Sequence, residues 1–239
     1  MTTDRKLAVL IDADNAQASI AKELLAEIAR YGNATVRRAY GDWTTTNLTG
    51  WKNVLLDLAI QPIQQFAYTK GKNATDSSLI IDAMDLLHKG DMDGFCIVSS
   101  DSDFTRLATR LRESGYAVYG FGEQKTPQPF VAACDKFIYT EILRPEGEAD
   151  AEPVIKQASG SLKTRLVKAI DDVTQEDGWA PLSTLGTALL SADPAFDARN
   201  FGHKKLSDLV RAQNYLEVKS VAAKDGSSGA RIYVKVKRK

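Results

Sequence analysis

From Leu7 to Tyr139, short apolar runs alternate with longer stretches whose apolar residues recur every three or four positions. The runs have the length of buried strands, and the stretches between them have the period of helices with one buried face. Such helices bury their apolar faces most simply on both sides of a parallel sheet. We therefore expect a doubly wound α/β domain with a mostly parallel sheet. Its strands are expected at residues 7–11, 36–40, 60–66, 94–99, 117–121 and 137–139, and its helices near residues 20–28, 51–58, 79–87 and 104–111.

A segment rich in proline, glycine and acids, residues 144–160, interrupts this pattern. It has too few apolar residues to hold a fixed shape, which predicts a linker. The first domain is then residues 1–143, and a second domain covers residues 161–239. In that second domain three helical stripes precede two β-rich runs, a pattern typical of a winged helix-turn-helix.

Charge is distributed unevenly between the two predicted domains. The whole chain of 239 residues has 31 basic and 31 acidic residues, which excludes a uniformly basic nucleic-acid coat. Residues 1–143 contain 15 basic and 18 acidic side chains, whereas residues 161–239 contain 14 and 9. A basic second domain beside an acidic first domain indicates a polyanionic partner for the second.

Several other classes of protein are disfavoured. The chain has no apolar run long enough to cross a bilayer and no signal-peptide core, and its two cysteines are too few for a disulfide framework. We therefore expect a cytoplasmic protein with no membrane partner. Two histidines and two separated cysteines argue against a zinc site. The sequence also lacks a glycine-rich phosphate-binding loop, so we expect no nucleotide cofactor.

Acidic side chains follow the first and fourth predicted strands at the point where each strand ends. Because the carboxyl ends of parallel strands lie at one edge of the sheet, these acids should converge on one crevice. Oxygen ligands without histidine or thiolate suit Mg²⁺ or Mn²⁺, which also relieve the repulsion between carboxylates and activate water for phosphodiester attack. The residues expected at this edge are Asp12, Asp14, Asn15, Asp76, Asp101 and Asp103.

Within this group the expected roles differ. Asn15 orients a substrate phosphate or a ligand water, and Asp14 and Asp103 have the alternative role of capping helices. Asp82 lies six residues beyond Asp76, which turns it by about 240° on an ideal helix. The two side chains therefore do not share a helix face, and only a supporting role for Asp82 stays open. The metal ligands are predicted to be Asp12, Asp76, Asp101 and Asp103.

Three motifs together resemble the NYN family of PIN-like nuclease domains. They are IDADN at residues 11–15, KGKNATD at residues 70–76 and SSDSDF at residues 99–104. The resemblance covers about residues 5–143 and implies a metal-dependent ribonuclease fold. It also implies the site residues, which here are Asp12, Asn15, Asp76, Asp101 and Asp103.

The second domain resembles the OST-HTH or LOTUS domain through GWAPLSTLG at residues 178–186 and DARNFGHKKLSDLV at residues 197–210. That resemblance implies a winged helix-turn-helix associated with RNA binding. Basic residues gather before the third predicted helix, where backbone N–H groups also favour phosphate. These candidate RNA contacts are Arg199, His203, Lys204 and Lys205.

Three candidate RNA contacts belong to the first domain. Lys70 and Lys72 flank Gly71 just before Asp76, where they can contact a phosphate backbone beside the metal site. Trp43 lies in a polar stretch and is a candidate for stacking on a base, whereas Trp51 fits the core stripe of a helix.

These observations predict a Mg²⁺- or Mn²⁺-dependent endoribonuclease whose C-terminal module binds RNA. The alternative is a non-catalytic RNA-binding regulator with a vestigial nuclease site. A phosphatase with an aspartate nucleophile, suggested by Asp12 and Asp14, leaves the basic domain without a purpose. A protein-interaction scaffold is a third alternative, and its affinity for a partner should depend less steeply on salt than phosphate contacts require. The sequence leaves open whether the chain forms a homo-oligomer.

Overall fold

The computed structural model describes residues 4–66, 74–144, 161–222 and 230–237. The chain divides into two compact units, Met1–Ala149 and Asp150–Lys239. Apart from Arg144, the predicted linker at residues 144–160 lies outside the described residues. Among the helices of the described segments, none combines the length and apolarity that crossing a membrane requires.

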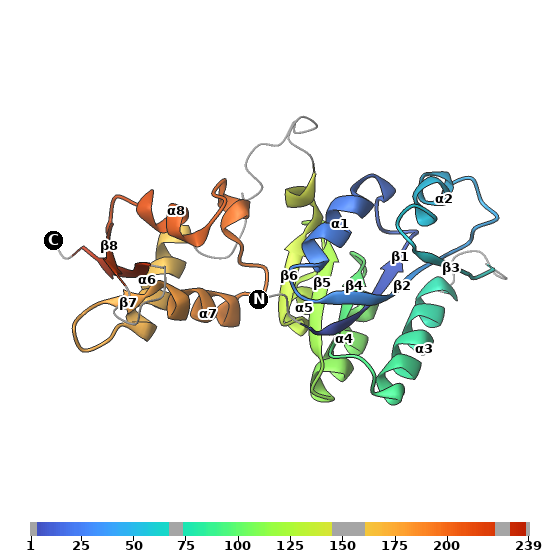
Figure 1. Cartoon of the computed structure of the whole chain (residues 1–239), viewed down its shortest axis with the longest axis horizontal. Helices are drawn as coiled ribbons and strands as arrows, with labels where there is room; N and C mark the ends of the chain where they lie inside the picture. The colour runs from blue at the N-terminus through green and yellow to red at the C-terminus, as the bar shows by residue number, and fades with distance from the viewer. Residues whose placement is uncertain (1–3, 67–73, 145–160, 223–229, 238–239) are drawn as a thin grey trace. The chain divides into compact units, whose positions relative to one another are not determined.

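The first unit is an α/β fold around a six-stranded sheet in which every pairing is parallel (Figure 1). In sheet order the strands are β3 (Gln61–Gln64), β2 (Asn33–Gly41), β1 (Lys6–Asp12), β4 (Gly94–Val98), β5 (Ala117–Gly122) and β6 (Lys136–Tyr139). The predicted fold class is confirmed, and each predicted strand overlaps an observed one. The order reverses between β1 and β4, the point at which sheets of this kind bind ligands.

Helices cover both faces of the sheet. Leu7, Val9 and Ile11 of β1 pack on one face with α1 (Ala21–Ile28) and α2 (Thr49–Leu55). On the other face lie α3 (Ala74–Lys89), which packs on β1 and β2, and α4 (Thr105–Glu113), which packs on β5 (Figure 1). Because side chains alternate along a strand, Asp12 at the end of β1 points to the face that α3 covers.

The periodicity did not predict α5 (Gln128–Ala133), because six residues are too few to display a helical repeat. Short 3₁₀ turns precede or follow the regular elements at η1 (Ala18–Ile20), η2 (Ser102–Phe104) and η3 (Thr140–Leu143). The most important of these is η2, since it contains Asp103 and has Asp101 as its N-cap.

The second unit packs helices on one side of a small antiparallel sheet, as predicted for this domain. Its helices in the described residues are α6 (Leu162–Val173), α7 (Leu182–Ala192) and α8 (Leu206–Arg211), with the 3₁₀ turn η4 (Ala198–Phe201) before α8. The sheet order is β7 (Ala180–Pro181), β9 (Ala230–Val236) and β8 (Leu216–Ala222). Leu166, Leu185 and Leu209 from the three helices meet Val234 of β9 in its core.

Candidate functional site

The candidate site lies at the carboxyl ends of β1 and β4, the two strands at which the sheet order reverses. Asp12 is the last residue of β1, and the chain after β4 enters η2 through Ser99, Ser100 and Asp101. Asp76 reaches the same edge from the first turn of α3. The topology thus brings together three segments that are far apart in the sequence, as the acidic clusters predicted.

The Asp12 carboxylate is fully buried, and its two oxygens have different surroundings. Ser99 Oγ donates to Asp12 Oδ2 over 2.7 Å, and Asn15 Nδ2 donates to the same oxygen over 2.8 Å. The other oxygen, Oδ1, is buried and has no hydrogen-bond donor among the described residues. Burial raises the pKa of Asp12, and the bonds from Ser99 and Asn15 offset this only in part.

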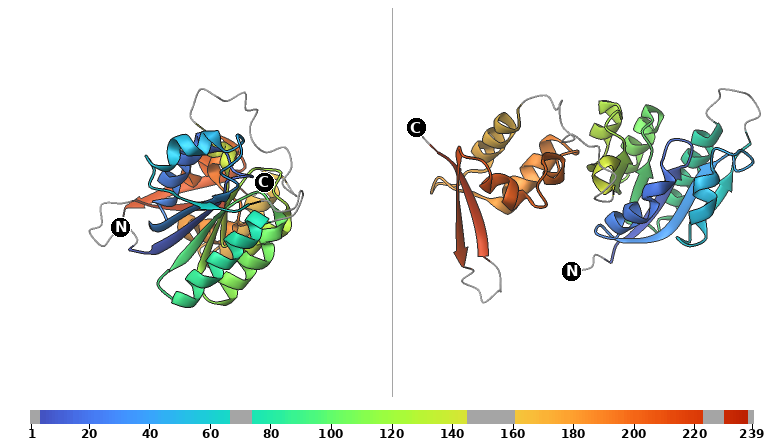
Figure 2. Two further views of the ribbon diagram at one scale, coloured as in Figure 1. Left: turned by 90° about the vertical axis from the view of Figure 1, so that its right-hand side faces the viewer. Right: turned by 90° about the horizontal axis from the view of Figure 1, so that it is seen from above.

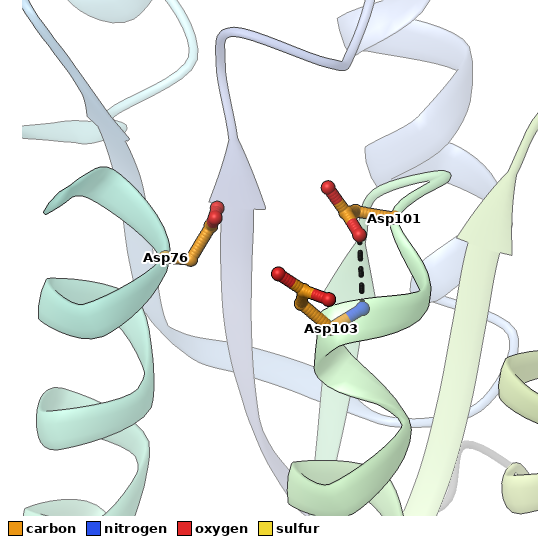
Figure 3. Close-up of side chains that lie close together, drawn as sticks. All are labelled: Asp76, Asp101 and Asp103. Carbon is orange, nitrogen blue, oxygen red and sulfur yellow. Dashed lines mark hydrogen bonds between the residues drawn. The ribbon is translucent and has the colours of Figure 1, made fainter. Parts of the chain in front are cut away.

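Asp76, Asp101 and Asp103 form a tighter cluster. One carboxylate oxygen from each of the three lies within 4.8 Å of the other two. Figure 3 shows Asp76 pointing from α3 toward the two acids that follow β4. Asp12 does not belong to this group by the same distance, so the site consists of a three-acid cluster beside a buried fourth carboxylate.

The backbone after β4 orients the acids of this cluster. The side chain of Asp101 caps η2 by accepting a hydrogen bond from the backbone N–H of Asp103 over 2.9 Å (Figure 3). The backbone N–H of Asp101 in turn donates to Ser99 Oγ over 3.1 Å. Ser99 therefore links Asp12 to Asp101 in one chain of hydrogen bonds. The sequence interpretation gave Ser99 no role, although its place directly after a buried strand was a usable signal.

Electrostatic repulsion at the site is most evident in Asp76. Burial first, and then the negative charges of Asp12, Asp101, Asp103 and Asp14, raise the pKa of Asp76 to about 6. A carboxylate in these surroundings is stabilised by a nearby cation, because the cation reverses the sign of the local field.

Asp14 and Asn15 lie at the rim and are exposed. Thr75 Oγ1 donates to Asp14 Oδ2 over 3.0 Å, which connects the turn after β1 to the first turn of α3. Asn15 holds the orientation of Asp12 through the bond described above, and Asp14 does not cap a helix with its side chain.

Asp82 points to the sheet and has structural partners. Arg38 Nη1 and the hydroxyl of Tyr40, both on β2, donate to Asp82 Oδ2 over 2.8 and 2.9 Å. Tyr40 is fully buried, and its pKa is raised by burial and by Asp82. Since Tyr40 pairs with Asp12 across the sheet, Asp82 supports the strand beside the site.

Of the RNA contacts predicted in the first unit, Lys70 and Lys72 lie outside the described residues. Trp43 is half-buried against the core, and its Nε1 donates to the carbonyl of Ile63 over 2.9 Å. Stacking of a base on Trp43 stays a prediction, although part of the ring is covered. Trp51 is buried, as predicted.

The predicted RNA contacts of the second unit separate into two kinds. Arg199 lies in η4, where its Nε and Nη2 donate to the two carboxylate oxygens of Asp197 over 3.0 and 2.8 Å. Lys204 and Lys205 are exposed just before α8, and His203 is half-buried. The lysines therefore fit the predicted surface better than Arg199, whose guanidinium already has a carboxylate partner.

Comparisons with known proteins add family information. The model of the NYN domain matches residues 6–143, and the model of the OST-HTH/LOTUS domain matches residues 159–227. No curated protein matches the chain.

Three solved structures are similar to parts of the chain. A protein of unknown function from Vibrio parahaemolyticus is 18% identical with a TM-score of 0.48, and the match covers 57% of this chain and 93% of that one. An uncharacterized protein from Nitrosomonas europaea is 31% identical with a TM-score of 0.32, covering 40% and 87% of the two chains. A fragment from Chromobacterium violaceum is 30% identical with a TM-score of 0.27, covering 36% and 87%.

Proposed function

The chain belongs to the NYN domain family and carries an OST-HTH/LOTUS domain after its NYN domain, and we propose that it is a divalent-cation-dependent endoribonuclease. The observation that carries the proposal is the gathering of Asp76, Asp101 and Asp103 within 4.8 Å of one another, at the edge of the sheet where Asp12 ends β1. The OST-HTH/LOTUS domain then supplies the RNA-binding module.

The residues at this edge fit a hard divalent cation. All four acids offer oxygen, the donor that Mg²⁺ and Mn²⁺ prefer. A buried carboxylate oxygen without a hydrogen-bond donor, such as Asp12 Oδ1, is costly unless a cation compensates for the lost hydration. We assign Asp12, Asp76, Asp101 and Asp103 to the cation. When bound, Mg²⁺ or Mn²⁺ neutralises the phosphodiester and makes water a better nucleophile.

The protein's own groups position the acids for this task. Ser99 donates to one oxygen of Asp12 and accepts from the backbone N–H of Asp101, which ties the end of β1 to the segment that follows β4. Asn15 holds Asp12 from the rim and is exposed, which leaves its side chain accessible to a substrate phosphate. Burial and the acidic neighbours raise the pKa of Asp76 to about 6, so a bound cation would stabilise its ionised form.

The second module raises the concentration of RNA near the nuclease domain because both belong to one chain. Lys204 and Lys205 contact the RNA backbone in this proposal, with His203 and Arg199 beside them and Lys70, Lys72 and Trp43 contributing from the first domain. A cytoplasmic location is part of the same proposal, and Cys96 and Cys134, both free and buried, are compatible with it.

The test uses the full chain with an end-labelled single-stranded RNA and with a circular RNA, each in Mn²⁺ and in EDTA. The variants are Asp12→Asn and Asp101→Asn, and the matched control is Asp85→Asn, which removes the same charge from an exposed position of α3. We expect Mn²⁺-dependent opening of the circle by the wild type and the control, and a rate lower by about 100-fold in both site variants.

Two outcomes contradict the proposal. Cleavage that persists in EDTA and in both site variants identifies a contaminating nuclease. Tight RNA binding by the wild type without Mn²⁺-dependent cleavage supports the alternative, a non-catalytic RNA-binding regulator with a vestigial site.

A further inference from the structure

The small sheet of the second unit has one face packed on helices and one face turned away from them. Leu216, Val218 and Val234 pack in or against the core, so the residues that alternate with them point outward. Figure 2 (right) shows the helices of this unit on one side of the β8–β9 hairpin. We call the outward side the outer sheet face, formed by Trp179, Glu217, Lys219, Val221, Arg231, Tyr233 and Lys235.

At the centre of this face, one lysine lies between two aromatic rings. Lys219 Nζ is 4.0 Å from the ring centroid of Trp179 and 5.4 Å from that of Tyr233. Lys235 Nζ also lies over the Trp179 ring, 5.7 Å from its centroid. The sheet register explains the arrangement, because Lys219 lies directly opposite Tyr233 and the neighbouring pair places Lys235 beside them.

None of these four side chains is buried in the core of the unit. Basic side chains also outnumber acids on the face, since Lys219, Lys235 and Arg231 stand against Glu217. Asp177 Oδ2 lies 3.9 Å from Lys219 Nζ in a solvent-exposed pair. Such a pair is weak and is exchanged readily for another anion.

Aromatic rings interleaved with lysines are the combination that binds single-stranded nucleic acid. Bases stack on the rings and the lysines neutralise the adjacent phosphates. When Lys219 turns from the Trp179 ring to a phosphate, the ring face that it covered becomes accessible to a base. A duplex keeps its bases stacked on one another, so it has no free base face to offer Trp179.

We propose that the outer sheet face binds single-stranded RNA, with bases stacked on Trp179 and Tyr233 and phosphates paired with Lys219 and Lys235. This surface is distinct from the basic residues before α8, to which the sequence pattern pointed. The inference rests on the RNA-binding function proposed above and assigns that function to particular side chains.

The test measures binding of the full chain to fluorescently labelled oligouridylate in EDTA, by anisotropy at several salt concentrations. The Lys219→Ala/Lys235→Ala variant should bind more weakly and reduce the slope of log Kd against log salt by roughly 1.4, because two phosphate contacts are lost. Trp179→Ala should weaken binding by about tenfold, and Trp179→Phe, which retains a ring, by no more than about threefold. The matched control, Lys163→Ala/Lys168→Ala, removes the same charge from α6 and should change Kd by less than about threefold.

A spectroscopic readout separates stacking from a loss of folding. RNA should quench the tryptophan emission of the wild type, whereas Trp179→Phe should lose most of that quenching. If Trp179→Ala does not fold, the double lysine variant, which leaves both aromatic rings in place, still decides the question.

The outcomes distinguish the inference from the function on which it rests. If the wild type binds RNA and the sheet-face variants bind equally well, the outer sheet face is not the RNA surface, although RNA binding stands. If Lys204→Ala/Lys205→Ala alone abolishes binding, the surface before α8 is the correct one. If the wild type binds no RNA, both proposals fail.

Discussion

The first unit has an acidic edge, formed by Asp12, Asp76, Asp101 and Asp103, and the second unit has the outer sheet face. Both surfaces are charged, but their charged side chains differ in burial and in the groups that surround them. At the acidic edge, Asp12 is fully buried with an oxygen that lacks a donor, and Asp76 has its pKa raised to about 6 by burial and by its acidic neighbours. At the sheet face, Lys219 stays partly exposed and rests on aromatic rings. The clustered carboxylates destabilise the fold without a counter-ion, whereas the lysine beside aromatic rings needs none.

The difference indicates what each site can accept. Closely spaced carboxylates beside a buried one suit a small ion that their oxygens coordinate together. Solvated lysines beside aromatic rings suit a flexible polymer whose phosphates and bases arrive one after another. Removal of an acid from the first site should therefore affect chemistry and metal-free stability, and changes at the second site should affect affinity.

The strongest test of this division is Asp76→Asn. We expect RNA cleavage in Mn²⁺ to fall by about 100-fold, because one of the three clustered carboxylates loses its charge. RNA affinity measured in EDTA should stay within about twofold of the wild type. A parallel loss of affinity and cleavage would mean that the acidic edge and the RNA surface are not separate sites.

The next largest effect is expected at Asp82, an acid of α3 whose partners, Arg38 and Tyr40, lie on β2. Asp82→Ala leaves the Arg38 guanidinium and the buried Tyr40 hydroxyl without their shared acceptor. We expect the free energy of unfolding to fall by about 2 kcal/mol in urea titrations. Asp85→Ala, at an exposed position of the same helix, should change it by less than about 0.5 kcal/mol. Equal effects of the two variants would contradict the structural role of Asp82.

A variant of Arg199 tests the comparison in the second unit. Its paired bonds to Asp197 predict that Arg199→Ala lowers the stability of this unit by about 1.5 kcal/mol, with little change in RNA affinity. Amide hydrogen exchange in peptides from residues 161–222 measures the stability, and anisotropy measures the binding. Lys204→Ala, exposed and nearby, serves as the control for stability. A large loss of RNA affinity with unchanged amide hydrogen exchange would instead mean that Arg199 contacts RNA.

The smallest effect is a pH dependence of the metal-free protein. The folded chain keeps the Asp76 proton up to about pH 6, whereas an unfolded aspartate, with its pKa near 3.8, releases it earlier. The folded state therefore binds more protons between these values, and the stabilisation present at low pH is lost as the pH rises through 6. After allowance for solvent screening we expect a loss of about 1 kcal/mol.

The measurement is the difference between wild type and Asp76→Asn in urea titrations at several pH values in EDTA. The variant should become the more stable protein above pH 6, and Mn²⁺ should stabilise the wild type but not the variant. Parallel profiles for the two proteins would show that the acids of this edge do not repel one another significantly.

Much of the first unit was predictable because its information is local and periodic. Each apolar run became a strand of the parallel sheet, and α1 to α4 match the four predicted amphipathic stretches. The acids that follow β1 and β4 were recognisable because the carboxyl ends of parallel strands share one edge. The helix α5 was missed, since its six residues are too few for a periodic pattern.

The partners of individual side chains were not predictable, because they come from distant parts of the chain. Ser99 binds Asp12 across 87 positions, and Asp82 binds Arg38 across 44. On an ideal helix Asp82 faces away from Asp76, but only the packing of α3 on β2 shows that it faces the sheet. The sequence places Trp43 in a polar stretch, whereas the structure shows that its indole N–H donates to the carbonyl of Ile63.

By itself, therefore, the amino-acid order determined the sequence of strands and helices, the division into an acidic and a basic half, and the edge at which the carboxylates collect. Tertiary structure alone decided which oxygen of Asp12 has no donor, that Lys219 lies between Trp179 and Tyr233, and that Arg199 is held by Asp197. The reason is physical. Hydrophobic periodicity is a property of residues that are neighbours in the sequence. Burial, charge repulsion and ring stacking depend on distances that exist only after the chain has folded.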